Sequence, residues 1–287
     1  MSKDYREFHC INSRKEGKTM KLVVLADNCT YIDQYHYGEP AVSYYIEDGD
    51  TKLLLDTGYS DVFMKNAGNM GLNLKNINFV VITHGHDDHI GGLLYYLEHR
   101  KDRDFSVISH PDAFNDKTKD GVRISAPMDQ AKLKDRCNLI LSKKPVSVSD
   151  NIIFLGEIPE RNAFEKRKAM GEQTLKGKVV DDFLLDDSAL VYKREDGIYI
   201  ITGCSHSGIC NIIEYAKEVT KKERVLGIIG GFHLFEVSEQ VHQTIDYLSR
   251  NNVQDLYPCH CTSFEVKAEI HKVLPIKEVG VGLQLHW

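Results

Sequence analysis

Hydrophobic positions along the chain gather in short runs of strand length, and these runs are separated by stretches with helical patterning. In the first half, apolar or alternating runs predict strands at 21–26, 43–47, 52–56, 77–83 and 105–110. The run INFVVIT at 77–83 is apolar throughout, as expected for a strand that is buried on both faces. The stretches at 60–70 and 92–100 predict helices.

The second half shows the same alternation from Ser188 onward. SALVYK and GIYIIT predict two strands, and the Asp196-Gly197 pair between them is a hairpin signal. Beyond this hairpin, the pattern predicts helices at 209–219, 238–250 and 263–273, and strands at 225–231, 255–261 and 278–283. This order of elements predicts two β-rich halves, each covered by helices, with a site along one edge of both sheets.

One domain is predicted over residues 20–287, preceded by a loose extension over residues 1–19. The extension is polar and mixed in charge, and it lacks the apolar segment of a signal peptide. Within the domain, a polar insertion near 157–187 interrupts the regular pattern, and it is either a lid or a surface loop. Asp186 and Asp187, at the end of this insertion, are expected to be solvated.

Composition and charge narrow the class of protein. The chain has 287 residues, 42% of them hydrophobic, so it can bury a sizeable core. No apolar run approaches the roughly 18–20 residues that span a bilayer, which argues against a membrane protein. A formal charge of −6 argues against a nucleic-acid-binding surface. Seven cysteines without a paired pattern favour a reducing cytoplasm over a disulfide framework.

The segment HGHDDH, directly after the apolar run at 77–83, carries the clearest chemical signal. It supplies His84, His86, Asp88 and His89. Crowded imidazoles repel one another when protonated and need partners when they are buried and neutral, and a divalent metal ion resolves both problems. Imidazole and carboxylate are good ligands for zinc, iron or manganese. The segment therefore predicts a site for one or two divalent metal ions, and its imidazole-rich composition favours zinc.

Further histidines follow predicted strand ends, at His206, His233 and His260. HGHDDH resembles the H-x-H-x-D-H signature of the metallo-β-lactamase superfamily. The segments TGCSHSGICNI, GGFHL and PCHCT resemble one branch, whose members are usually labelled 7,8-dihydropterin-6-methyl-4-(β-D-ribofuranosyl)aminobenzene 5′-phosphate synthase. This resemblance runs from Met20 onward. It implies an α+β fold, an αβ/βα four-layer sandwich of two mixed β-sheets flanked by helices, with the metal site at the sheet edge.

The resemblance also implies how the ligands are divided. Where relatives have T-G-D at a strand end, this chain has Cys204 in place of the aspartate, and His206 follows two residues later. The expected ligands are His84, His86 and His206 for one metal ion, and Asp88, His89 and His260 for a second. Cys204 is either a thiolate ligand or a small buried side chain. Flavo-diiron proteins resemble this pattern but have glutamate at the position of His86, so an oxygen-reducing role is not expected.

Metal-assisted hydrolysis is the function that these residues favour. Metal binding lowers the pKa of water from 15.7 to about 7, so that hydroxide is present at neutral pH. Asp88 is expected to orient this water, and either the second metal ion or His233 to stabilise charge on the leaving oxygen. Asp56, at the end of a predicted strand, is expected to orient a ligand or a turn and not to bind the metal itself.

The expected partner is a small molecule, phosphoester-like or pterin-related, and the oligomeric state is left open. The resemblance also allows a synthase-type transferase that displaces pyrophosphate from an activated dihydropterin. A third possibility is a metal-dependent sensor that holds its ligand without converting it. A nuclease would need a basic face, and no G-x-S-x-G segment supports a serine hydrolase.

Overall fold

The buried runs of the first half form a seven-stranded mixed sheet, which the C-terminal strand completes. The computed structural model describes residues 19–126, 128 and 130–287, so nearly all of the extension predicted over residues 1–19 lies outside the described residues. The strand order is β17-β1-β2-β3-β4-β5-β8. The bounds are β1 (Lys21–Ala26), β2 (Ser43–Asp48), β3 (Thr51–Leu55), β4 (Phe79–Val81), β5 (Ser106–Ser109), β8 (Asn138–Leu141) and β17 (Gln284–His286).

The second half forms a six-stranded sheet in the order β16-β15-β14-β13-β10-β9. Its strands are β9 (Val146–Ser147), β10 (Ile152–Phe154), β13 (Ala189–Arg194), β14 (Gly197–Thr202), β15 (Val225–Gly230) and β16 (Asp255–Pro258). The pair β13 and β14 is the predicted antiparallel hairpin. Strands β14, β15 and β16 run parallel, so their carboxyl ends meet at one edge of the sheet.

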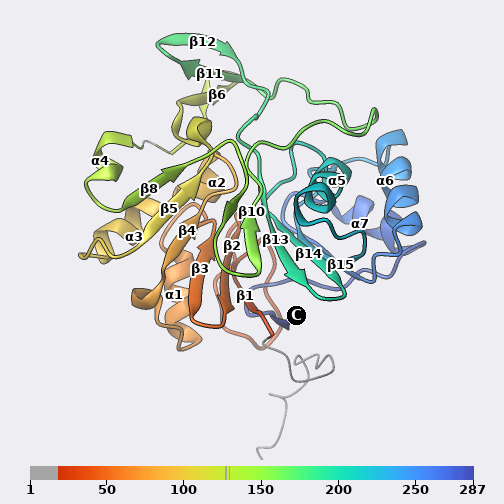
Figure 1. Cartoon of the computed structure of the whole chain (residues 1–287), viewed down its shortest axis with the longest axis horizontal. Coiled ribbons are helices and arrows are strands. Elements are labelled where there is room, and N and C mark those ends of the chain that lie inside the picture. The colour runs from red at the N-terminus through yellow and green to blue at the C-terminus, as the bar shows by residue number, and fades with distance from the viewer. Residues whose placement is uncertain (1–18, 127, 129) are drawn as a thin grey trace, which may run out of the picture.

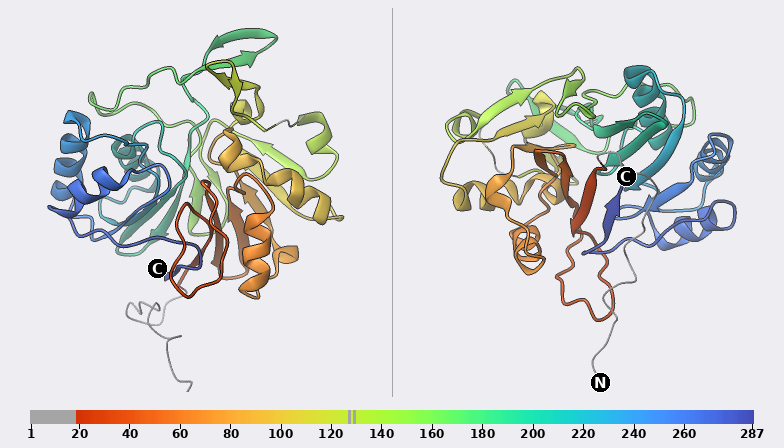
Figure 2. Two further views of the ribbon diagram at one scale, coloured as in Figure 1. Left: turned by 180° about the vertical axis from the view of Figure 1, so that it is seen from behind. Right: turned by 60° about the horizontal axis from the view of Figure 1, so that its bottom comes forward.

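Helices cover the outer face of each large sheet, as the views in Figure 1 and Figure 2 show. The first half contributes α1 (Val62–Asn69), α2 (Asp87–Ile90), α3 (Leu93–His99) and α4 (Gln130–Lys134), with the 3₁₀ turns η1 (Leu74–Asn76) and η2 (Pro111–Phe114). The second half contributes α5 (Ile209–Thr220), α6 (Glu239–Arg250) and α7 (Phe264–His271). In the described part of the chain, no helix combines the length and the apolar character needed to cross a bilayer.

Three hydrophobic clusters hold these layers together. One fills the space between the two sheets and includes Tyr44 of the first sheet and Ile201 of the second. Another packs the six-stranded sheet against α5, α6 and α7 through residues such as Ile212 and Leu248. The third packs the seven-stranded sheet against α1, α3 and α4, with Phe63 at its centre. Since burial of apolar area is the main stabilising term in folding, these interfaces account for the predicted αβ/βα four-layer sandwich, which is confirmed.

A third sheet of four strands, here called the small sheet, projects from the top of the molecule in Figure 1. Its order is β12-β11-β6-β7. The strands come from two distant segments and are β6 (Lys117–Lys119), β7 (Val122–Arg123), β11 (Glu172–Leu175) and β12 (Lys178–Asp181). The polar insertion predicted near 157–187 therefore contains a β-hairpin that pairs with β6, and not an irregular loop throughout.

The end of this insertion contradicts one prediction. Asp186 and Asp187 are buried, whereas the sequence predicted solvated side chains. Asp186 Oδ2 accepts a hydrogen bond from the backbone N–H of Gly85 at 2.8 Å, and Asp187 Oδ2 accepts one from the N–H of Ser207 at 2.9 Å. The sequence pattern missed these contacts because Gly85 lies 101 residues from Asp186.

The last strand also differs from its prediction. It covers Gln284–His286, whereas the sequence predicted 278–283. Val281 makes an isolated bridge to Thr30, and Gly282 has a φ of +97°, so the chain turns before β17 begins. The alternation of apolar residues and glycine at 278–283 reflects burial and not pairing, because the valines and Leu283 there are buried outside any strand.

Candidate metal centre

The HGHDDH segment forms the tight turn between β4 and α2. His84 Nε2 lies 3.1 Å from His86 Nδ1, and the two rings meet edge to face with centroids 4.7 Å apart. Gly85, between them, packs against backbone, since a Cβ added there would lie 2.0 Å from the carbonyl oxygen of Ala113. Asp88 and His89 follow on the first turn of α2. The segment thus presents four potential ligands from one short stretch.

The six-stranded sheet brings the other predicted residues to the same place. His206, His233 and His260 each follow the carboxyl end of a parallel strand, β14, β15 and β16 in turn. The His206 ring lies 4.8 Å from that of His84, centroid to centroid, and the His260 ring lies 5.2 Å from that of His89. All six predicted ligands therefore converge, although they come from opposite halves of the chain.

The first predicted group, His84, His86 and His206, has the chemistry of a metal site. Burial, joined by the neighbouring imidazoles, holds the pKa of His84 and of His206 well below the usual value, and burial lowers the pKa of His86 to about 4. The rings are therefore neutral at pH 7 and carry free lone pairs. Both ring nitrogens of His206 and Nε2 of His86 are buried without a hydrogen-bond partner. Such orphaned nitrogens are costly unless a cation binds them, so the residues fit a divalent metal ion.

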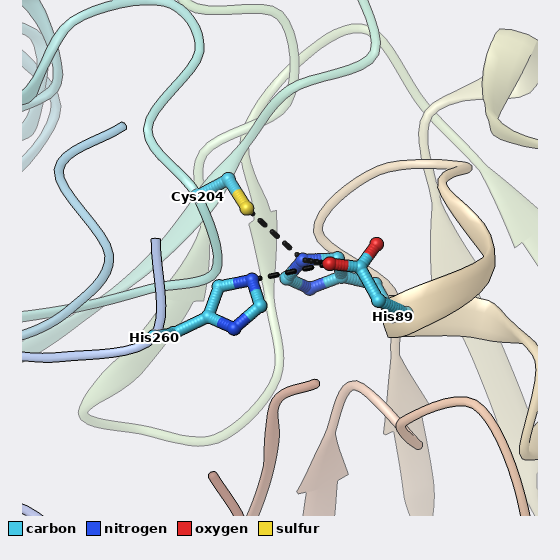
Figure 3. Close-up of side chains that lie close together, drawn as sticks. His89, Cys204 and His260 are labelled. Carbon is cyan, nitrogen blue, oxygen red and sulfur yellow. Dashed lines mark hydrogen bonds and ion pairs between the residues drawn. The ribbon is translucent and has the colours of Figure 1, made fainter. Parts of the chain in front are cut away.

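The second predicted group gains a thiol. The donor atoms of Asp88, His89, His260 and Cys204 all lie within 4.8 Å of one another. Figure 3 shows Cys204, His89 and His260 pointing toward one another from separate elements. Cys204 Sγ lies 3.1 Å from His89 Nε2, and Asp88 Oδ2 lies 3.1 Å from His260 Nε2. The geometry fits a second metal ion and places Cys204 among its potential ligands.

Donor atoms of the two groups also lie close to each other. Cys204 Sγ is within 4.8 Å of donor atoms of His84 and His206 as well as those of the second group. The carboxylate of Asp88 is within the same distance of donor atoms of His84 and His86. Burial opposes ionisation of Asp88, but His89 and His260 outweigh it and keep the pKa of the carboxyl well below its usual value. Asp88 is therefore an anion that adjoins both groups.

Asp56 has the orienting position that the sequence predicted. Its Oδ2 lies 2.6 Å from His89 Nδ1, and it also accepts hydrogen bonds from the N–H and the hydroxyl of Thr83. A carboxylate on the outer nitrogen fixes the ring of a metal-binding histidine and leaves the inner nitrogen free for the metal. Burial lowers the pKa of His89, and the charges of Asp88 and Asp56 raise it further than burial lowers it.

His233 lies beside the first group and not within it. Its ring is 4.1 Å from that of His206, and its Nδ1 is buried without a partner. The thiol of Cys261 forms a further group with His233 and Cys204, in which the donor atoms lie within 4.8 Å of one another. The only sequence signal for Cys261 was its position directly after His260 at a strand end. Cys259, two residues earlier, packs against the hydroxyl of Tyr44.

The strand-end turns at this site use uncommon backbone conformations. Asp56, Ser205, His233 and His260 have φ values of 58°, 58°, 50° and 49°, in the left-handed region. Non-glycine residues there are uncommon and cluster at functional sites. At His233 and His260 this backbone occurs in residues whose ring nitrogens belong to groups of potential ligands, whereas the Ser205 hydroxyl donates to the carbonyl of Gly231.

A cavity of about 330 Å³ opens onto both groups. It is lined by residues of the segments that connect the strands of the two large sheets and by residues of the small sheet and its connections. The described lining residues are Asn28, Pro40, Tyr59, His86, Asp87, Asp88, Lys119, Ile124, Met170, Cys204, His206, His233, Phe235, His260 and Cys261. Its size suits a small-molecule ligand.

Comparisons with known proteins agree with this geometry. The profile of the Metallo-beta-lactamase superfamily matches residues 36–219. An uncharacterized protein of Methanocaldococcus jannaschii is 31% identical over 256 residues, which covers 88% of this chain and 94% of the relative. A second protein of that organism, named 7,8-dihydropterin-6-methyl-4-(beta-D-ribofuranosyl)-aminobenzene-5'-phosphate synthase, is 28% identical over 263 residues, which covers 86% of this chain and 89% of the relative.

Among solved structures, Tm1679 is similar over nearly its whole length. It is described as a metal-dependent hydrolase of the beta-lactamase superfamily, and it matches with a TM-score of 0.79 and 28% identity over 93% of this chain and 98% of that one. The sequence matches, the fold and the convergence of histidines at the sheet edge all indicate the same protein family. The chain belongs to the metallo-β-lactamase superfamily.

Proposed function

We propose that this protein is a zinc-dependent hydrolase that acts on a small phosphoester. The observation that carries the proposal is the pair of buried, unpartnered ring nitrogens of His206, which face the imidazoles of His84 and His86 beside an open cavity. Neutral imidazoles and a thiol are donors that suit zinc better than magnesium or calcium. The free thiols of all six described cysteines favour a reducing compartment, such as the cytoplasm.

The side chains divide the chemistry between them. His84, His86 and His206 would hold one divalent metal ion, and Asp88, His89 and His260 a second; when bound, such ions would lower the pKa of water from 15.7 to about 7. Asp88, as an anion between the groups, accepts a hydrogen bond from the attacking water and orients it. The His233 ring lies 4.1 Å from that of His206, and in this proposal it would donate a hydrogen bond to the leaving oxygen.

A synthase-type transferase is the second candidate, because a 28% identical relative carries a synthase name. The same arrangement would then serve displacement of pyrophosphate from an activated dihydropterin, with an amine or a carbon nucleophile in place of water. The two candidates differ in what attacks and not in the groups that hold the metal. Product analysis with and without an acceptor molecule separates them.

Elemental analysis and a model reaction test the proposal together. Protein purified without added metal should contain zinc, and it should hydrolyse bis(4-nitrophenyl) phosphate. Removal of the metal with a chelator should abolish hydrolysis, and zinc should restore it. His206→Ala should lose metal and activity while its circular dichroism stays that of the wild type. Hydrolysis that survives complete metal removal would contradict the proposal.

A further inference from the structure

Two lysines of β6 have opposite surroundings. Lys117 is fully buried, and its Nζ donates to Asp182 Oδ2 at 2.7 Å and to Asp186 Oδ1 at 2.8 Å. Lys119, two residues later, is exposed and lines the cavity over the metal centre. Within the described residues, no carboxylate pairs with Lys119. One ammonium group is thus neutralised inside the protein, and the other is available to a ligand.

The position of Lys117 shows which way Lys119 points. Side chains at i and i+2 lie on the same face of a strand. Lys117 reaches Asp186, and Asp186 accepts a hydrogen bond from the N–H of Gly85, inside the HGHDDH turn. The face of β6 that carries both lysines therefore points toward the metal centre, and Lys119 lies one step farther out along the wall of the cavity.

The β6–β7 hairpin is also fixed relative to the metal centre. The N–H of Asp87 donates to the carbonyl of Ile124 at 2.9 Å, and His86 forms a bridge with Ser125. These contacts tie the segment directly after β7 to the turn that carries the potential ligands. The base of Lys119 is therefore held at a set distance from the metal centre, while its four-carbon side chain adjusts to what it binds.

The charged residues that line the cavity indicate what Lys119 can bind. Among the described lining residues, Lys119 is the only lysine or arginine, and Asp87 and Asp88 are the only carboxylates. Apolar side chains, including Ile124, Met170 and Phe235, share the lining. A site with a metal centre, an apolar lining and one unpaired ammonium group suits a molecule with a reacting ester, an apolar portion and a separate anion.

We propose that Lys119 is a specificity-determining residue that binds a second anionic group of the substrate, a carboxylate or a phosphate, away from the ester that reacts. The inference rests on the proposed function, since it places the reacting ester at the metal centre. It adds that the substrate carries two anionic groups and that the small sheet selects for the second.

Binding of phosphonates, which are not hydrolysed, tests this assignment on the metal-loaded protein. Calorimetry would compare carboxyalkylphosphonates of increasing chain length with alkylphosphonates of matching length. At the length that reaches Lys119, the carboxylate should strengthen binding to the wild type by about fivefold, and added salt should weaken this gain. Lys119→Gln should remove the gain and leave the affinity for alkylphosphonates unchanged.

Lys178→Gln is the matched control, because Lys178 is an exposed lysine on β12 of the same sheet and does not line the cavity. It should keep the full carboxylate gain and an unchanged metal content. A gain that persists in Lys119→Gln, a wild type that shows no gain at any length, or a wild type that binds no phosphonate would each overturn the assignment. The proposed function fails separately, through absence of hydrolysis by a protein that still shows the gain.

Discussion

The two halves of the molecule contribute to the metal centre in different ways. The first half supplies His84, His86, Asp88 and His89 from a single turn. The second half supplies its residues one loop at a time, from the ends of β14, β15 and β16. A short local motif and a set of parallel strands thus build one site. In the first half the spacing of the ligands is set by their positions in one short segment. In the second half it is set by the pairing of the parallel strands.

The segments that carry the potential ligands are held in place by specific contacts in both halves. The turn of the first half is supported on several sides, by Asp56 on His89, by Asp186 on Gly85 and by the bridge from His86 to Ser125. The loops of the second half are also held by residues outside them, since Asp187 accepts a hydrogen bond from the N–H of Ser207, and Asn28 Oδ1 lies 3.1 Å from His260 Nδ1. The turn of the first half supplies potential ligands to both metal groups, so a change there should affect both, whereas loss of His206 alone or of His260 alone should affect one group.

The largest effect is expected for Asp88→Ala, because this carboxylate adjoins donors of both groups. Metal content should fall close to zero, and hydrolysis should fall by about 10³-fold or more. Elemental analysis and steady-state rates measure the two outcomes. Asp87→Ala is the neighbouring control and should retain its metal. An Asp88→Ala variant with full metal content would show that the two groups do not share this ligand.

A change in the second half should be more selective. His260 belongs to the group of Asp88, His89 and Cys204 and to no other group of potential ligands among the described residues. His260→Ala should therefore lose the second metal ion and retain the first. Elemental analysis of the dialysed variant checks this. Loss of both ions would mean that the two metal groups do not bind their ions independently.

Next in size is the effect of Lys117→Met on folding. The substitution leaves Asp182 and Asp186 buried without their cation, and loss of one member of a buried ion pair costs about 3–5 kcal/mol. Urea denaturation should show this decrease in the free energy of unfolding. Lys178→Met, on the exposed strand β12, should change it by less than about 0.5 kcal/mol. A similar decrease in the free energy of unfolding in both variants would contradict a specific stabilising role of the buried Lys117 ion pairs.

A smaller effect is expected for Asp56→Asn. Asparagine tolerates the left-handed backbone of this position, so the turn should be kept. The amide accepts less strongly from His89 than a carboxylate does, and loss of such support weakens metal binding by about 10–100-fold. A competition titration against a chelator gives the affinity. Unchanged affinity would mean that packing alone orients His89.

The smallest effect is a change in the acid limb of stability. Burial raises the pKa of Asp186, but the charge of Lys117 outweighs it and holds the pKa below the usual 3.8. The folded state therefore binds fewer protons here than the unfolded state, so this stabilisation is fully present above pH 3.8 and is lost as the pH falls further. Chemical denaturation at a series of acidic pH values should show a shallower loss in Asp186→Asn than in the wild type. Parallel curves would contradict the linkage.

The features that the sequence predicted correctly depend on residues close together in the chain, and the features it missed depend on residues far apart. The HGHDDH turn, the β13–β14 hairpin and the helices α5 and α6 were predictable, because their signals lie within a few residues of one another. The histidines after strand ends were predictable once parallel strands were expected. The pairing of β6 with β11 was not, because their residues are more than fifty positions apart and neither strand has a strong pattern.

Two residues show the limit most clearly. Asp186 looked like a solvated carboxylate at the end of a polar stretch, since nothing nearby in the sequence reveals Gly85 and Lys117 as its partners. Residues 278–283 looked like a strand, because buried valines alternate with glycines there. The sequence indicated burial correctly for the valines of 278–283 and wrongly for Asp186, and in both cases contacts across the fold decided the outcome.

The left-handed backbone at His233 and His260 has a consequence for engineering. Such a conformation costs a non-glycine residue about 1–2 kcal/mol, and glycine adopts it without that penalty. Glycine at either position should therefore relax the metal-free chain, while it removes an imidazole from the centre. Selection for thermostability alone would favour such replacements and would yield more stable variants with a weakened metal centre. A thermostability screen of this chain therefore needs a measurement of metal content or activity beside it.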